Sequence, residues 1–400
     1  MSNFKVGTAK VNITPFLGCP MAGYSSREQG SETIDDELYC KALVLYDGET
    51  KLAIVTNDLI GVNDIFVRRT RELIENAAGI PKGNVLICAS HTHFGPEVRH
   101  KDEATIKESD NKFNFAYVSV LQKKMATAVQ LANQSLKDAK IGVGKGCTDK
   151  LSFNRHTIRP DGTAVTTYRL PTKEENLTFG PIDPEIGVVR LDSANSEPIS
   201  TLINFACHPV CSVDRMYAIS ADYPGYAMKS IERELGGTCM FTLGCAGNIV
   251  PIEREGASKR KIGVSLAAEA IKTWQWLDLT DSIKLGSMQK IIELPLKEPK
   301  DDKKTREVEI QALKIGNLYF VGLPGEIFVE IGTGIKEKAG IENLFPVSLA
   351  NGSVGYVPIA IAYDQGGYEA NSTSFAKGSG EILQDAALEL VRSCYTSGEQ

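Results

Sequence analysis

The chain has 400 residues, of which 42% are hydrophobic and 24% are charged, as in an ordinary globular protein with a sizeable core. The formal net charge of −6, without any basic block to offset it, argues against nucleic acid as a partner. No run of 18 apolar residues occurs and the N-terminus lacks an apolar export segment, so we expect a cytoplasmic protein without integral membrane association. The nine cysteines lie mostly in apolar runs and are expected to be buried thiols.

The first part of the chain predicts strands and one amphipathic helix. Alternating apolar and polar residues indicate an opening strand over 4–13, and a hairpin is expected with strands 39–46 and 52–56. Between them lies a Gly- and Ser-rich loop at 20–27, whose tyrosine and arginine could face a site. A 3.6-residue periodicity predicts a helix over 65–78, which Gly79 would end.

The run 85–89 is apolar or small at every position, which predicts a strand buried on both faces. Ser90 and a His-x-His pair, His91 and His93, follow it directly. Because side chains at i and i+2 of an extended chain point to the same face, we expect both imidazoles to project together from the carboxyl end of this strand. Open α/β sheets keep their binding sites at that end. The pair therefore predicts a metal or catalytic site rather than two histidines satisfied within the core.

The rest of the chain continues the alternation of buried strands and helices. The polar segment 98–112 is interpreted as a flap over the site or a dimer contact, and homo-oligomerisation is left open. The strand 199–206 delivers His208 at its carboxyl end, as the strand 85–89 delivers His91. Further strands are expected at 140–146, 186–191, 240–243, 283–294, 307–315, 318–323 and 347–350, and helices at 115–136, 221–235, 258–276 and 380–392. No linker composition interrupts this pattern, so residues 1–400 are read as one continuous α/β unit.

A carboxylate follows the strand 318–323. Glu326 is expected where a helix to about residue 338 begins, and the helix N-terminus would favour its charged form. The Gly- and aromatic-rich stretch 352–375 is expected to be a loop, and a loop of that length in a compact domain is usually functional.

Separate strand ends thus carry two histidines and one carboxylate. A catalytic zinc ion takes about three nitrogen or oxygen ligands from the protein and keeps an open position for water. Bound zinc lowers the pKa of that water to about 7 and polarises a carbonyl group. Residue spacing alone therefore predicts a zinc hydrolase, without indicating its substrate.

The order of motifs along the chain resembles that of the neutral, non-lysosomal ceramidases. Ser90-His91-Thr92-His93-Phe94-Gly95-Pro96 is similar to their His-Thr-His-Ser-Gly-Pro signature. The likeness continues in the same order at residues 23–26, 154–155, 206–208, 221–222, 244–248, 324–326 and 356–373. The resemblance implies an α/β fold of the α/β/β/α type, in which two central mixed β-sheets are flanked by helices.

The resemblance also implies roles for single residues. One Zn²⁺ per chain would be held by His91, His208, Glu326 and Tyr363. His93 matches a histidine that contacts the scissile amide and its oxyanion, and Arg155 matches an arginine that hydrogen-bonds the substrate. The implied reaction is hydrolysis of the amide bond of ceramide or a related N-acyl compound by zinc-bound hydroxide. The expected partner is therefore a small-molecule or lipid-like N-acyl substrate.

The chain departs from the family pattern around the predicted zinc tyrosine. Phe375 lies where these ceramidases tend to have a tyrosine, and residues 358–362 replace a polar Thr-Thr-x-Glu-Glu run. Tyr356 and Tyr368 are therefore alternatives to Tyr363 as the metal ligand. No separate C-terminal immunoglobulin-like domain is expected.

Three other functions compete with amide hydrolysis. A zinc-dependent esterase or lactonase acting on a soluble metabolite would keep the metal and change the bond. A non-catalytic ceramidase-like protein would only bind a ligand or partner. An amidohydrolase barrel also uses His-x-His, but it needs further histidines and a late aspartate, and the chain shows no eightfold strand–helix alternation.

Overall fold

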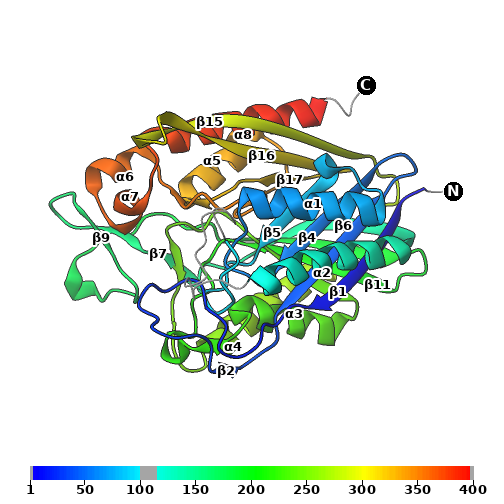
Figure 1. The fold of residues 1–400 in the computed structure, drawn as a ribbon, viewed down its shortest axis with the longest axis horizontal. Helices are drawn as coiled ribbons and strands as arrows, with labels where there is room; N and C mark the ends of the chain where they lie inside the picture. Colours follow the sequence, from blue (N-terminus) through cyan, green and yellow to red (C-terminus); the bar gives the residue numbers. More distant parts are fainter. Residues whose placement is uncertain (1–2, 100–114, 397–400) are drawn as a thin grey trace.

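Two β-sheets form the centre of the computed structural model, which describes residues 3–99 and 115–396 (Figure 1). The larger sheet has the strand order β13-β11-β10-β6-β1-β3-β4-β5. It is mixed, because β4 pairs with β5 and β11 with β13 in parallel, whereas the other neighbours are antiparallel. Its strands are β1 (Lys5–Asn12), β3 (Tyr39–Tyr46), β4 (Lys51–Asn57), β5 (Val85–Ala89), β6 (Lys137–Cys147), β10 (Glu185–Ser193), β11 (Pro198–Phe205) and β13 (Thr238–Leu243).

The smaller sheet has the order β15-β16-β17-β19. Its strands are β15 (Leu285–Lys300), β16 (Lys303–Ile315), β17 (Leu318–Gly322) and β19 (Asn343–Val347). The strand predicted at 347–350 is wrong in its bounds, because β19 ends at Val347 after pairing in parallel with β17. Beyond it, Leu349 and Asn351 have positive φ angles of 51° and 58°, which a strand cannot accommodate.

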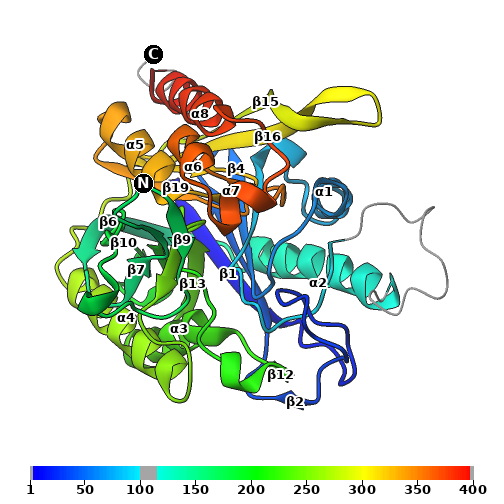
Figure 2. The ribbon, with the colours of Figure 1, turned by 90° about the vertical axis from the view of Figure 1, so that its left-hand side faces the viewer.

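Helices cover the outer face of each sheet, as Figure 2 shows with α5 and α8 on one side and α3 and α4 on the other. The large sheet packs against α1 (Asp64–Ala78), α2 (Phe115–Gln134), α3 (Asp222–Leu235) and α4 (Ser258–Trp274). The small sheet packs against α5 (Val329–Ala339) and α8 (Ser379–Thr396). Local sequence sets the ends of α1, since the Asn63 side chain accepts from the Phe66 amide and Gly79 takes the left-handed conformation.

A second hydrophobic core lies between the two sheets. Leu86 of β5 packs there with Phe320 of β17 and Phe345 of β19. The other face of β5, which carries Ile87, packs with the helices that cover the large sheet. Both faces of β5 are therefore buried, as its unbroken apolar run predicted, and the α/β/β/α arrangement is confirmed.

Short elements connect these layers at the end where β5 and β11 terminate. They are β2 (Thr33–Ile34), β12 (Ala218–Ile219), β7 (Ser152–Asn154), β14 (Ile249–Pro251), β8 (His156–Ile158), β9 (Ala164–Thr166), β18 (Glu326–Ile327), β20 (Tyr356–Val357), α6 (Ala360–Gln365), α7 (Tyr368–Ser372) and the 3-10 turns Lys173–Glu175 and Val213–Arg215. A further 3-10 turn, Lys82–Asn84, precedes β5. The stretch 352–375, expected as a loop, thus contains β20, α6 and α7.

Glu326 lies in β18 and not at a helix start, because α5 begins only at Val329. Most of the predicted flap, residues 100–112, lies outside the described residues. Among the residues that the structure describes, no helix has an apolar stretch long enough to cross a membrane.

Candidate metal centre

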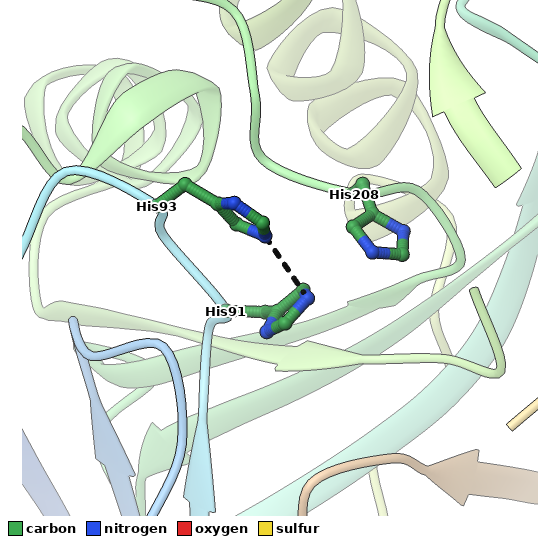
Figure 3. A group of neighbouring side chains, drawn as sticks. All are labelled: His91, His93 and His208. Carbon is green, nitrogen blue, oxygen red and sulfur yellow. Dashed lines mark hydrogen bonds between the residues drawn. The ribbon is translucent and has the colours of Figure 1, made fainter. Parts of the chain in front are cut away.

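His91 and His93 follow β5 on a tight turn. The His91 amide donates to the Leu59 carbonyl at 2.9 Å, and His91 has a positive φ of 71°. The expected extended chain is therefore wrong, but the expected convergence is right, because the two Nε2 atoms lie 3.2 Å apart (Figure 3). A left-handed residue of this kind costs on the order of 1–3 kcal/mol and is typically retained where function requires it.

Main-chain carbonyls fix the tautomers of two histidines. Nδ1 of His91 lies 2.7 Å from the Ile60 oxygen, and Nδ1 of His208 lies 2.6 Å from the Ala246 oxygen and 3.0 Å from the Ile249 oxygen. A carbonyl oxygen can only accept, so each Nδ1 carries the proton and donates it. The lone pair of each Nε2 is consequently left to bind a metal ion, and such carbonyl contacts commonly orient ligating histidines.

The lone pairs of these histidines converge on the Glu326 carboxylate. Glu326 Oε2 lies 3.3 Å from His91 Nε2 and 3.2 Å from His208 Nε2. Three acceptors this close repel one another unless a proton or a cation lies between them. Ligand atoms of His91, His93 and His208 all lie within 4.8 Å of one another. Imidazole nitrogen and carboxylate oxygen are the ligands that zinc takes, so the residues fit a metal ion.

The protonation states of the cluster also suit a metal. Burial raises the pKa of the Glu326 carboxyl, but His91 and His208 outweigh that effect and hold this pKa well below its usual range. Burial, together with Arg155, lowers the pKa of His208 to about 4. Burial, with His91 and His208, lowers the pKa of His93 well below its usual value. At neutral pH the carboxylate is charged and these two imidazoles are neutral, as metal ligands must be.

Arg155 reaches the same region from the turn between β7 and β8. Its Nε donates to Glu369 Oε1 at 2.5 Å, and its Nη2 donates to the Gly247 carbonyl at 3.1 Å and to the Tyr356 hydroxyl at 3.0 Å. The Glu369 side chain is fully buried, so this ion pair fixes the orientation of the guanidinium. The structure therefore brings Arg155 together with Tyr356 at the edge of the cluster.

The three candidate tyrosines have different surroundings. Tyr363 donates its hydroxyl to the Phe375 carbonyl at 3.0 Å, and its ring faces the Lys297 ammonium. Tyr356 stands directly opposite Glu326 in the parallel pair of β18 and β20. Burial first, and then the charge of Glu326, raises the pKa of the Tyr356 hydroxyl well above its usual value. The Tyr368 ring packs edge-on against Tyr356 at 5.6 Å.

The loop before β2 also faces the site, as its composition suggested. The Tyr24 ring lies 5.3 Å from the His93 ring, and Arg27 Nη2 donates to the His93 carbonyl at 2.8 Å. A Cβ atom at Gly23 would lie 2.7 Å from the His93 side chain.

Sequence reasoning missed the carbonyls that orient His91 and His208, since main-chain acceptors leave no signal in residue type.

Comparison with known proteins relates the chain to ceramidases. The sequence profile described as "Neutral/alkaline non-lysosomal ceramidase, N-terminal" matches residues 4–248. A neutral ceramidase of Mycobacterium tuberculosis is 25% identical over 241 residues, which cover 58% of this chain and 36% of that protein. A neutral ceramidase of Pseudomonas aeruginosa is 24% identical over 290 residues, which cover 67% of this chain and 41% of that protein. The alignments thus span well under half the length of these curated relatives.

Solved structures show the same fold. The crystal structure of the neutral ceramidase from Pseudomonas aeruginosa matches with a TM-score of 0.80 and 19% identity, over 98% of this chain and 74% of that chain. A ceramidase complexed with C2 matches with a TM-score of 0.81 and 19% identity, over 99% of this chain and 76% of that chain.

Proposed function

Since the chain belongs to the neutral/alkaline non-lysosomal ceramidase family, we propose that it is a zinc-dependent hydrolase that cleaves the amide bond of ceramide or a related N-acyl compound. The observation that carries the proposal is the convergence of His91, His208 and Glu326 on one point, with His93 beside it. The relatives named neutral ceramidases support an amide as the bond that is cleaved.

One zinc ion would be held by His91 Nε2, His208 Nε2 and Glu326 Oε2. When bound, the ion supplies a water molecule of lowered pKa and an electrophile for a carbonyl oxygen. We assign the place beside the ion to the Tyr356 hydroxyl instead of Tyr363, because Tyr356 lies opposite Glu326 in the strand pair. Arg155 holds this hydroxyl by donating to its oxygen.

His93 and Arg155 would act on the substrate. His93 is neutral at physiological pH, so its ring can donate one N–H to the amide carbonyl as negative charge develops there. Nδ1 of His93 is buried against Gly23, whereas Nε2 faces the cluster 3.2 Å from His91 Nε2, so Nε2 is the atom that would contact the substrate. Arg155, oriented by Glu369, adds positive charge on the same side. The leaving amine must also receive a proton, as in other amide hydrolyses.

The metal content of two variants tests this division of roles. His91→Ala should lose zinc, because an imidazole ligand is removed. His93→Ala should keep zinc and lose roughly 10²–10³-fold in kcat, the usual cost of removing an oxyanion donor. His156→Ala is the matched control, since its Nε2 contacts Gln365 outside the cluster, and its zinc content should be unchanged. Equal zinc loss in His91→Ala and His93→Ala would show that both are ligands, and full zinc in His91→Ala would reject the site.

A substrate panel decides which bond is cleaved. Zinc-loaded protein should release the amine from ceramide or from a shorter N-acyl compound. Turnover of lactones without turnover of any amide would reject the amide proposal in favour of an esterase or lactonase. Zinc-dependent turnover of any substrate would reject a purely binding function.

The assignments of residues 1–400 to one catalytic unit and to the cytoplasm stay predictions from the sequence. Fractionation of cells that express the natural gene, followed by detection of the protein in each fraction, tests the second of them.

A further inference from the structure

Arg254 lies near the candidate metal centre without a carboxylate partner among the described residues. Its Nε donates to the Val210 carbonyl at 3.3 Å, its Nη1 to the Tyr168 carbonyl at 3.2 Å, and its Nη2 to the Tyr24 hydroxyl at 3.4 Å. All three acceptors are neutral, and all three distances are at or beyond the long end of the hydrogen-bond range. Arg155, by contrast, pairs with the carboxylate of Glu369.

The position of Arg254 connects it to both residues assigned to the substrate. The Arg254 guanidinium lies 5.4 Å from the centre of the Tyr168 ring, and the Arg155 guanidinium lies 5.6 Å from the same ring. The Tyr24 hydroxyl contacts Arg254, and the Tyr24 ring packs on His93. One tyrosine therefore separates Arg254 from Arg155 and another separates it from His93. Tyr168 is 45% exposed, so this surface is open to a ligand.

The charges around Arg254 favour an anion. The Arg27 guanidinium, which packs on the Tyr24 ring, donates to the carbonyls of Met216, Ala22 and His93. These three acceptors are neutral, so they leave the positive charge of Arg27 uncompensated. Asp222, which interacts electrostatically with Tyr24, is fully buried, and its carboxylate accepts hydrogen bonds from the amides of Cys211 and Tyr223. Two acids flank Arg254 in the chain: Glu253 pairs with Lys261, and Glu255 is exposed to solvent.

We propose that Arg254, with Tyr24 and Tyr168, binds a carboxylate group of the substrate. The preferred substrate would then be an N-acyl compound with a carboxylate near the scissile amide, such as an N-acyl amino acid, instead of one with the uncharged head group of ceramide. A guanidinium is planar and can donate two parallel N–H bonds to one carboxylate. The three separate neutral acceptors of Arg254 do not provide this paired geometry. This inference rests on the proposed amide hydrolysis, and it names the substrate class of that site.

A structural role is the competing explanation, because Arg254 links three loops. Loss of such a link would disturb charged and uncharged substrates alike. Only recognition of an anion makes the effect depend on the charge of the substrate.

The test compares N-lauroylglycine with its primary carboxamide, which has nearly the same size but no negative charge, and it measures the release of laurate from each, so that only cleavage of the acyl amide is counted. Zinc-loaded wild-type protein should prefer the acid in kcat/KM. Arg254→Gln should lower the ratio of kcat/KM for the acid over the carboxamide by roughly 10–100-fold, the range of a hydrogen bond to a charged group. Arg254→Lys should keep part of the preference. The control is Arg169→Gln, which removes an exposed arginine next to Tyr168 that pairs with Glu175, and the ratio should not change.

Equal kcat/KM for the two substrates in wild type, or an unchanged ratio in Arg254→Gln, would overturn the inference and leave amide hydrolysis standing. Calorimetric binding of the sulfonamide analogue of N-lauroylglycine separates the two proposals, because this analogue has no amide to hydrolyse. If the analogue binds wild type but not Arg254→Gln and neither amide is turned over, the carboxylate subsite is right and the hydrolase proposal is wrong. If the analogue binds both proteins equally, the subsite is wrong.

Discussion

At the scale of single residues, the direction of each lone pair decides what the candidate site can bind. His91 and His208 are oriented by hydrogen bonds from Nδ1 to main-chain carbonyls, so neither ring can turn without losing a buried contact. The ligand nitrogens are therefore fixed before any ion arrives, and Glu326 completes the set from a different part of the chain.

Substitution of the candidate tyrosines tests which hydroxyl belongs to the site. Tyr356→Phe should lower kcat strongly, because it removes the oxygen that accepts from Arg155 opposite Glu326. Tyr363→Phe should cost only about 1 kcal/mol of stability, the typical value of one hydrogen bond, with kcat unchanged. Steady-state kinetics and thermal unfolding of both variants measure this. A large loss of kcat in Tyr363→Phe alone would restore the original assignment.

The contact between Gly23 and His93 predicts a selective loss of activity. Gly23→Ala adds a Cβ atom 2.7 Å from the His93 side chain, so the imidazole must move. We expect turnover to fall while zinc is retained, because His93 is not assigned to the metal. The matched control is Gly18→Ala, which also has a positive φ but no atom within 4 Å of the added Cβ. If both variants lose activity equally, backbone strain and not the contact with His93 is responsible.

At the scale of elements, the site is assembled by the ends of β5 and β11 and by the short pair of β18 and β20. The short helix α7 is tied to this assembly through Glu369, whose carboxylate binds Arg155 in the interior. A helix of five residues has little stability of its own, so this ion pair and the surrounding contacts hold it in place.

Removing the charge of Glu369 should therefore destabilise the protein. Glu369→Gln leaves the buried Arg155 guanidinium unpaired, which should cost about 3–5 kcal/mol in the free energy of unfolding. The control is Asp364→Asn, which breaks the exposed pair with Lys377 and should cost at most about 1 kcal/mol. Urea unfolding measures both, and equal small losses would contradict the structural importance assigned to Glu369.

At the scale of the whole molecule, the candidate site joins the two layers. His91 and His208 follow strands of the large sheet, whereas Glu326 follows β17 of the small sheet. A metal ion held by all three would bridge the two sheets on one side of the core that lies between them.

Zinc should consequently stabilise the folded protein. At 100 times its dissociation constant, a ligand that binds only the folded state adds about 2.7 kcal/mol to the free energy of unfolding. The Tm should rise on addition of zinc to chelator-treated protein, and His208→Ala should abolish this rise. Differential scanning calorimetry checks it. An identical Tm with zinc and with chelator would count against a bridging metal.

Local patterns in the sequence determined most elements of this protein. The strand Val85–Ala89 was predicted with its observed bounds, and helix α1 was predicted within one residue, because an unbroken apolar run, helical periodicity and a C-terminal glycine are properties of neighbouring residues. The order of motifs likewise led to the candidate ligands His91, His208 and Glu326.

Only the tertiary structure decided how distant segments meet. Tyr356 lies opposite Glu326 because β18 and β20 pair across some thirty residues of intervening chain, and no local pattern distinguishes it from Tyr363. Arg254 shows the same limit, since its contacts come from three separate loops. Periodicity and capping act over a few residues, whereas the choice of partner across a site depends on packing of the complete fold.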